Sequence, residues 1–505
     1  MLCSIQWTLY WEAKVSFTVQ LDTGSTDLWV AAPNATLQLT NSTSLNISAT
    51  YGTGTVSGFI QFAELQIGQY TVPSQVFINV DQADSGQRQF LSDGVDGIMG
   101  MAFLDDTASS IFDAIDQAWG SGSTSLANSV PVNIFAQNSS APDFFDINLS
   151  RDIDLDGNTL GLFAISEHIP GFENVTQTPK LYRQNPDRWA IAMDSLQVNG
   201  QAFTFNKSSL STIPAGKVGA VLDTGASLPQ LPGPAIDFIY GSIPGALSDG
   251  DIGWIVPCYG TTNLTLTFGG QAIPIHPLDL TYIDFFVDPT SGMNITICRN
   301  AYNALSLGPN FTGFDLLLGD SFLRNVYASF DFGDAGTTNN SFIQLLPTTD
   351  PSAAWTEFVL ARAETLAGLP PIADPPVLEL LIEYETNSTS SDNSTSTGDA
   401  GDPTDSLSGA IQNDDTTNST PSSNYQTTDS NAVNLLDKYG PVVVGLLAGN
   451  ILISLLLLIV GLVACTRGWM RKGARSAPSY VPVRLKEAAM AEDMDYRSST
   501  SYNRP

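Results

Sequence analysis

The sequence LDTGS at Leu21–Ser25 returns as LDTGA at Leu222–Ala226, in the second half of the chain. Each copy follows an apolar, strand-like run. A single Asp-Thr-Gly is a common turn, because Asp and Gly both favour turns. Two copies, one in each half of the chain, indicate two similar lobes that bring Asp22 and Asp223 to a shared site. Two carboxylates in contact cannot both ionise easily, so they share one proton and supply an acid and a base together.

The region up to residue 347 favours β-structure. Short alternating runs such as Phe17–Leu21 and Leu264–Phe268 are separated by Gly, Pro and Asn, which is typical of half-buried strands joined by turns. Helical patterns are few, and the strongest covers Ser109–Trp119. We therefore predict an all-β fold of two lobes, with an N-terminal lobe at 1–170 and a C-terminal lobe at 171–347.

The charge and the histidine content exclude several function classes. The 505 residues carry a formal net charge of −31, from 51 Asp and Glu against 20 Lys and Arg, which argues against nucleic acid as a partner. The acidity fits either an acidic compartment or a simple need for solubility. The two histidines, His168 and His276, have no metal-ligand spacing, so we expect no metal, no cofactor and no His-dependent catalysis.

The uncharged run 441–465 predicts a transmembrane helix. Its 25 residues, at ~1.5 Å per residue, are long enough for a ~30 Å hydrocarbon layer. Basic residues follow at once, between Arg467 and Arg475, so the positive-inside rule places 466–505 in the cytosol. We expect a single-pass type I membrane protein whose ectodomain is extracellular or lumenal, at the cell surface or in a vacuole or endosome.

Between the lobes and this span, residues 348–440 predict a linker and a stalk. Residues 386–432 are mostly Ser, Thr, Asn, Asp and Gly, which cannot bury a core, so we expect a disordered and glycosylated stalk. Asn-X-Ser/Thr sequons occur throughout the predicted ectodomain and favour a glycoprotein of the secretory pathway. They begin at Asn34, Asn41, Asn46, Asn138, Asn148, Asn174, Asn206, Asn263, Asn294, Asn310, Asn339, Asn387, Asn393 and Asn418.

Two of the four cysteines, Cys258 and Cys298, lie between strand-like runs of the second lobe. In an extracellular setting this pair predicts one disulfide. Cys465 ends the predicted span, where we expect a buried or acylated thiol, and Cys3 has no assignment.

Five segments, in order along the chain, resemble motifs of the pepsin-like aspartic peptidases. They are the first catalytic loop and its following strand at Asp22–Val30, the flap tip at Tyr51–Gly54, a supporting element at Asp96–Gly100, the second catalytic loop at Asp223–Ser227 and the second supporting element at Leu317–Arg324. The resemblance covers about residues 12–347 and implies the bilobal pepsin-like fold. It also implies a monomeric aspartic-type endopeptidase that acts on proteins or peptides, with a disulfide where Cys258 and Cys298 fall.

The resemblance also implies roles for the residues of the two loops. Asp22 and Asp223 would hold one water, which one carboxylate deprotonates while the other protonates the scissile carbonyl oxygen. The supporting residues would be Thr23 and Thr224, whose hydroxyls bond across to the opposite loop, Gly24 and Gly225, whose N–H groups approach the carboxylates, and Ser25, which donates to Asp22.

The flap residues Tyr51, Gly52 and Thr53 would close over the substrate and exclude water. Trp29 either supports Tyr51 through a hydrogen bond or belongs to the core as a buried aromatic residue. The sequence leaves both interpretations open.

Ala226 departs from the family, which usually has Ser or Thr at this position. Asp223 then lacks one hydroxyl donor. Because donors favour the charged carboxylate, this loss should raise the pKa values of the pair. We therefore expect an activity optimum shifted toward neutral pH, and we expect Ala226→Thr to move the acidic limb of the pH–rate profile down.

The N-terminus departs as well, because no Gly-rich strand precedes Phe17–Leu21. Residues 1–12 also lack the basic start and the small-residue cleavage site of a signal peptide. The span and the sequons require entry into the secretory pathway, so we expect the true start, with signal peptide, pro-segment and first strand, to lie upstream.

Two functions compete at this point. Both intact aspartates favour the endopeptidase. The departure at the N-terminus favours the alternative, a catalytically inactive surface glycoprotein that binds peptides or surface partners with the same cleft.

Overall fold

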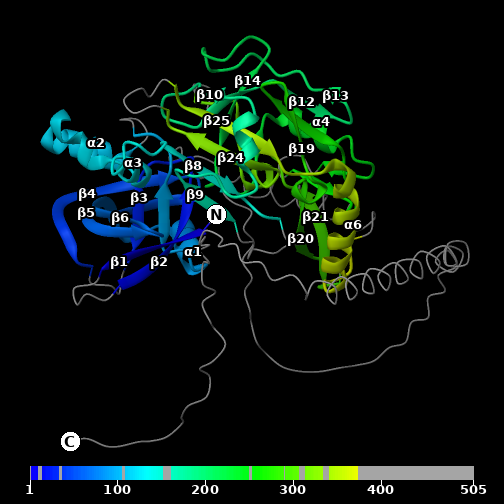
Figure 1. Cartoon of the computed structure of the whole chain (residues 1–505). Helices are drawn as coiled ribbons and strands as arrows, with labels where there is room; N and C mark the ends of the chain where they lie inside the picture. The colour runs from blue at the N-terminus through cyan, green and yellow to red at the C-terminus, as the bar shows by residue number, and fades with distance from the viewer. Residues whose placement is uncertain are drawn as a thin grey trace, which may run out of the picture. The chain divides into compact units, whose positions relative to one another are not determined.

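A computed structural model describes the part of the chain that carries both LDTG loops (Figure 1). It describes residues 2–8, 14–32, 37–104, 109–151, 161–248, 253–288, 291–305, 313–333 and 340–373. This part is mostly β and contains several sheets, as the sequence predicted. The predicted span 441–465, the tail 466–505 and the stalk residues 386–432 lie outside the described residues. Within the described ranges, no helix is both long and apolar enough to cross a membrane.

A seven-stranded sheet dominates the first half of the chain. β2 runs parallel to β7 and pairs Asp22 with Gly100, while β3 runs antiparallel to β7. Across the sheet the strands are β1 (Leu2–Thr8), β2 (Lys14–Asp22), β7 (Gly97–Gly100), β3 (Leu28–Ala31), β6 (Tyr70–Ala83), β5 (Gly54–Ile67) and β4 (Leu39–Tyr51).

The structure places a strand where the sequence predicted none. β1 pairs antiparallel with β2, from Leu2 opposite Gln20 to Thr8 opposite Lys14. No Gly-rich turn lies between residues 2–8 and the next strand, so this pairing was not predictable from the sequence.

The second half of the chain repeats the arrangement around its own LDTG. β14 runs parallel to β23 and pairs Leu222 with Leu318, while β15 pairs antiparallel with β23. This sheet contains β11 (Ala190–Met193), β14 (Val218–Leu222), β23 (Leu316–Leu318), β15 (Gln230–Leu231) and β22 (Asn303–Ala304). Two four-stranded sheets accompany it. One contains β13 (Gln201–Ala202), β12 (Ser195–Val198), β18 (Leu264–Phe268) and β19 (Gln271–Pro274), and the other β16 (Leu247–Ser248), β17 (Trp254–Val256), β21 (Asn294–Asn300) and β20 (Thr281–Val287).

A five-stranded sheet joins strands from both halves. β8 from the first half pairs antiparallel with β24 from the second, so backbone hydrogen bonds tie the halves together. Its strands are β10 (Leu181–Tyr182), β25 (Phe342–Pro347), β24 (Val326–Asp331), β8 (Phe144–Asn148) and β9 (Leu162–Ile165). The predicted boundary between residues 170 and 171 lies on the connection from β9 to β10.

Six α-helices and three 3-10 helices occur among the described residues. In α2, Ser109 caps the first turn by accepting a hydrogen bond from the Phe112 N–H, while Ile111 and Ile115 face the core. The α-helices are α1 (Ser85–Ser92), α2 (Ser110–Trp119), α3 (Val130–Phe135), α4 (Gly233–Tyr240), α5 (Asp320–Leu323) and α6 (Pro351–Ala367). The 3-10 helices are η1 (Ser121–Ala127), η2 (Glu173–Gln177) and η3 (Pro277–Asp279).

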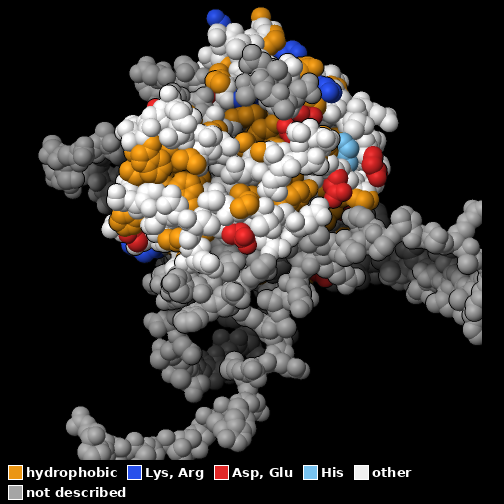
Figure 2. Space-filling model, turned by 60° about the vertical axis from the view of Figure 1, so that its left-hand side comes forward, with side chains coloured by type: hydrophobic (Ala, Val, Ile, Leu, Met, Phe, Trp, Pro, Cys, Tyr) orange, Lys and Arg blue, Asp and Glu red, His pale blue; other side chains and the backbone are white. Residues whose placement is uncertain are grey.

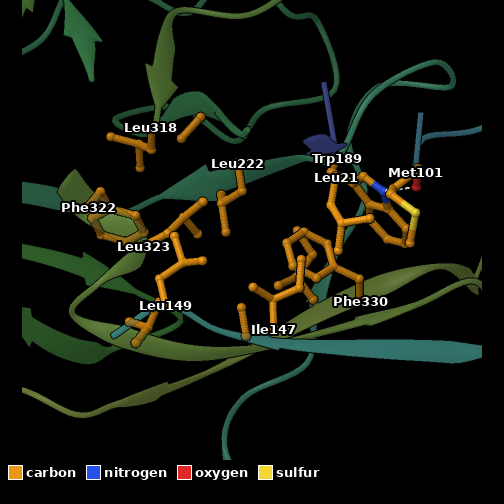
Figure 3. Packing of buried hydrophobic residues seen from close by; sticks show 14 of the residues in the cluster. Leu21, Met101, Ile147, Leu149, Trp189, Leu222, Leu318, Phe322, Leu323 and Phe330 are labelled. Atoms are coloured by element: carbon orange, nitrogen blue, oxygen red, sulfur yellow. Dashed lines mark hydrogen bonds between the residues drawn. The ribbon is translucent and has the colours of Figure 1, made fainter. Parts of the chain in front are cut away.

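The main hydrophobic core runs directly behind both LDTG loops. Leu21 and Leu222, which precede the two aspartates, are fully buried. Figure 3 shows them beside Trp189, whose indole N–H donates to the Met101 carbonyl at 3.0 Å. A shared core behind the loops fixes where each strand ends, because close-packed interiors tolerate little displacement.

The disulfide between Cys258 and Cys298 is confirmed. Helix α6 packs beside it and occupies the start of the region that the sequence assigned to a linker. Arg362 of α6 is fully buried and donates to the carbonyls of Cys258 and Thr281 at 3.0 and 3.1 Å. A buried guanidinium with carbonyl acceptors holds the helix against the second half of the chain.

Candidate active site

The two LDTG loops lie where a parallel strand pair ends in each half. The Asp22 carbonyl accepts a hydrogen bond from the Met101 N–H at 2.8 Å, and the Asp223 N–H donates to the Leu318 carbonyl at 3.0 Å. Gly100 must be a glycine, because a Cβ there would lie 2.2 Å from the backbone of Thr26. The predicted supporting elements therefore hold the predicted loops through backbone contacts.

Thr23 and Thr224 bind the two loops to each other. The Thr23 N–H donates to the Thr224 hydroxyl at 3.1 Å, and the Thr224 N–H donates to the Thr23 hydroxyl at 3.0 Å. Each hydroxyl then donates across to the opposite strand, Thr23 to the Leu222 carbonyl at 2.8 Å and Thr224 to the Leu21 carbonyl at 2.7 Å. Both threonines are fully buried, so these four bonds connect the halves without competition from water.

The glycines show that the two carboxylates face each other across the loops. A Cβ on Gly24 would lie 2.4 Å from Asp223 Oδ2, and a Cβ on Gly225 would lie 2.3 Å from Asp22 Oδ1. Each glycine also donates its N–H to the aspartate of its own loop, at 2.8 Å to Asp22 and 2.7 Å to Asp223. Only a residue without a side chain fits between the carboxylates in this way.

The two carboxylates differ in their donors. Asp22 also accepts from the Ser25 hydroxyl at 2.5 Å, whereas Ala226 at the matching position has no hydroxyl to offer Asp223. Burial raises the pKa of Asp223 well above its usual range, and the charge and hydrogen-bonding contact of Asp22 raise it further. A raised pKa favours the protonated form, so Asp223 is the carboxyl that favours holding the proton shared by the pair.

The predicted flap is a hairpin of β4 and β5 with Tyr51 and Gly54 paired at its tip. Trp29 is fully buried, and its ring lies 6.3 Å from the ring of Tyr51 and 6.1 Å from that of Phe90. Burial raises the pKa of Tyr51 well above its usual range. The Trp29 indole N–H is close enough to Tyr51 to oppose part of this shift, yet it meets hydrogen-bonding geometry with no described residue. Trp29 thus supports Tyr51 chiefly by packing.

The flap tip is anchored to the start of α1. The Asp84 carboxylate accepts hydrogen bonds from the Gln87 N–H at 3.0 Å and from the Thr55 N–H at 2.6 Å, which lower the pKa of Asp84. Gly54 has φ +143°, and a Cβ there would lie 2.2 Å from Asp84 Oδ1. The buried Gln87 side chain donates to the Thr53 hydroxyl at 2.8 Å, while Gly52 is exposed.

Sequence reasoning missed two polar side chains that reach the loops. Gln20 donates to the carbonyls of Thr224 and Gly225 at 3.3 and 3.2 Å. Arg188 donates to the Gly24 carbonyl at 3.2 Å. Gln20 directly precedes the first LDTG, so its position was a usable signal, whereas Arg188 lies in no motif. Among the described residues, no cluster of His, Cys, Asp and Glu could hold a metal ion.

A model of the family described as eukaryotic aspartyl protease matches residues 12–338. The chain belongs to this aspartyl protease family. Similar proteins include Pepsin-3 of Oryctolagus cuniculus, 27% identical over 335 residues, which cover 62% of this chain and 74% of that protein. Pepsin A of Sus scrofa is 27% identical over 337 residues, covering 62% and 75%. Major aspartyl peptidase 1 of Cryptococcus neoformans is 23% identical over 340 residues, covering 63% and 64%. The residues matched by the family model include both LDTG loops and the flap tip.

Proposed function

We propose that this aspartyl protease is an active endopeptidase that hydrolyses peptide bonds in proteins with water activated between Asp22 and Asp223. The observation that carries the proposal is the crossed packing of the loops, in which each glycine lies against the carboxylate of the opposite loop. Such packing preorganises an acid and a base at one point and needs no reorganisation during the reaction.

The different environments of the carboxylates assign the two roles. Asp22 accepts two donors and takes a proton from water as the oxygen attacks the scissile carbonyl carbon, while Asp223 gives its proton to the carbonyl oxygen. The resulting gem-diol loses its amine when Asp22 returns a proton to the nitrogen and Asp223 recovers one from a hydroxyl. The C–N bond breaks, both carboxyls return to their starting states, and no covalent enzyme intermediate forms.

Besides the two carboxylates, the reaction needs a site that is covered from water, and the anchored flap provides this cover. The Tyr51 ring packs near that of Trp29, and the Asp84 carboxylate holds the hairpin tip. A flap over the bound peptide excludes water and strengthens the electrostatic interactions of the carboxylates. Proteins and peptides are the substrates, and no cofactor takes part.

The proposal is tested with a casein-type protein between about pH 3 and about pH 6, where a shared carboxylate proton is available. We expect cleavage that a statine-type transition-state inhibitor blocks and that Asp22→Asn or Asp223→Asn abolishes. Asp81→Asn, at an exposed carboxylate of β6, serves as the matched control and should cleave normally. Inhibitor binding without cleavage would favour the alternative, an inactive peptide-binding glycoprotein.

We also propose that the protein is anchored in a membrane by residues 441–465, with its ectodomain extracellular or lumenal. The support is the uncharged run followed by basic residues. Full-length protein should stay with membranes in alkaline carbonate and become soluble when truncated before residue 441. Release of the full-length protein by carbonate would refute the anchor.

A further inference from the structure

Arg188 connects the two halves of the chain at the candidate active site. It lies two residues before β11, and the next residue, Trp189, is fully buried, with its carbonyl accepting from the Leu222 N–H at 3.1 Å. The Arg188 side chain itself is only partly buried. Its Nη1 reaches the Gly24 carbonyl of the opposite loop at 3.2 Å.

The guanidinium of Arg188 has further N–H donors that a ligand could use. It is half-buried, and its centre lies 5.8 Å from the ring of Phe314. Among the described residues, no carboxylate forms an ion pair with it, although its charge opposes part of the rise in the pKa of Asp223. A guanidinium has five N–H donors, and the bond to Gly24 uses one of them.

Basic side chains are scarce in this protein. The chain has 20 Lys and Arg in 505 residues, and they are few on the face shown in Figure 2. The many distant carboxylates repel an acidic ligand, but salt screens charges beyond about 8 Å at physiological ionic strength. A contact with Arg188 at the loops is partly buried and is screened less.

We propose that Arg188 recognises an acidic side chain of the substrate, within a few residues of the scissile bond. This inference rests on the proposed endopeptidase function. The planar guanidinium suits a carboxylate, which it binds through two parallel hydrogen bonds. The Gly24 carbonyl and the Phe314 ring hold the side chain in place, so less conformational entropy is lost when the substrate binds.

The ionisation of the substrate gives this contact a distinctive pH dependence. Arg188 remains charged throughout, whereas a substrate Glu titrates at about pH 4.3. The preference for Glu should therefore be full well above that pH and absent well below it. The rate of cleavage itself also changes with pH, so each Glu peptide is compared with its Gln twin at the same pH.

The experiment uses pairs of otherwise neutral peptides that differ only in having Glu or Gln at one position. Each of the three positions on either side of the scissile bond is tested in turn. The ratio of the two kcat/KM values is measured at about pH 5.5 and about pH 3. We expect wild type to favour Glu about tenfold at one position at the higher pH, and not at the lower one. Arg188→Gln should bring the ratio to about one, while Arg188→Lys should keep part of it.

Lys180→Gln is the matched control, because it removes the same charge from an exposed side chain and should keep the wild-type ratio. A ratio at or below one at all positions in wild type, or an unchanged ratio in Arg188→Gln, would overturn the inference. If Arg188→Gln fails to fold, the ratios of wild type and Arg188→Lys at the two pH values still decide it. Failure of the proposed function is distinct, because wild type would then cleave neither peptide.

Discussion

Ala226→Thr tests how the hydrogen-bond donors around the Asp22–Asp223 dyad set the pKa values of the two carboxyls. Ser25 lies three residues after Asp22 and donates to it at 2.5 Å. Ala226 lies three residues after Asp223 and has only a methyl group. Asp223 accepts from the Gly225 N–H at 2.7 Å, and a hydroxyl at position 226 would give it the second donor that Asp22 already has.

The magnitude follows from the strength of one such bond. A hydrogen bond to a charged group contributes about 1.5–3 kcal/mol, and about 1.4 kcal/mol corresponds to one pKa unit. Asp223 is partly exposed and shares its proton with Asp22, so we expect the pKa of Asp223 to fall by about one unit. The sequence alone predicted a change in the acidic limb. Because the pKa of Asp223 is raised and the proposed mechanism uses Asp223 as the acid, we now expect the change in the alkaline limb.

The assay is kcat/KM for a neutral peptide from about pH 3 to about pH 8, whose limbs report the ionisations of the free enzyme. Ala226→Thr should move the alkaline limb down by about one unit. Ala226→Val is the matched control, since it has the same shape as Thr but no hydroxyl. If the two variants share one alkaline limb, the hydroxyl does not reach Asp223 and the reasoning fails.

Three further predictions concern buried or anchoring groups. Burial raises the pKa of Asp27 to about 6, so the folded chain holds a proton that the unfolded chain loses near pH 4. The stability that this proton contributes, about 3 kcal/mol, is present below about pH 4 and is lost as pH rises through about 6. The free energy of unfolding, measured in urea, should show this loss in wild type and not in Asp27→Asn. Arg362→Met leaves buried carbonyls unpaired and should lower the free energy of unfolding by about 3 kcal/mol, whereas Leu360→Gln on the exposed side of α6 should change it by about 0.5 kcal/mol or less. Asp84→Ala frees the flap tip and should lower kcat/KM about tenfold, mainly through a higher KM.

Each of these has a contradicting result. A pH dependence of stability that is the same in wild type and Asp27→Asn would show that Asp27 ionises normally in the folded protein. Equal stability of Arg362→Met and Leu360→Gln would show that the buried guanidinium is dispensable. Wild-type kinetics in Asp84→Ala would show that the flap does not depend on its anchor.

Motifs with strong local chemistry were predictable from the sequence. The LDTG loops, the flap tip at Tyr51 and the disulfide of Cys258 and Cys298 each need particular residues in a fixed order. Tight turns and disulfides each require particular residue types, and these can be recognised in the sequence. The mostly β fold was predictable for a similar reason, because alternation of apolar residues follows directly from strand geometry.

Contacts made by single side chains over long sequence separations were not predictable. Arg188 reaches Gly24 from a segment with no motif, and its role depends on how the two halves meet. Arg362 lies in a stretch that the sequence assigned only to a linker, yet it is fully buried beside the disulfide. The neighbours that satisfy a buried charge come from distant strands, and one sequence does not show which strands those are.

The most direct measurement of the central claim, that Asp22 and Asp223 act as one unit, is a double-mutant cycle on kcat/KM. Wild type, Asp22→Asn, Asp223→Asn and the double variant are compared on one peptide. If the carboxylates share a proton and a water, each single substitution should cost as much as the double substitution. Losses that add independently, or one single variant that retains activity near that of wild type, would contradict the shared dyad.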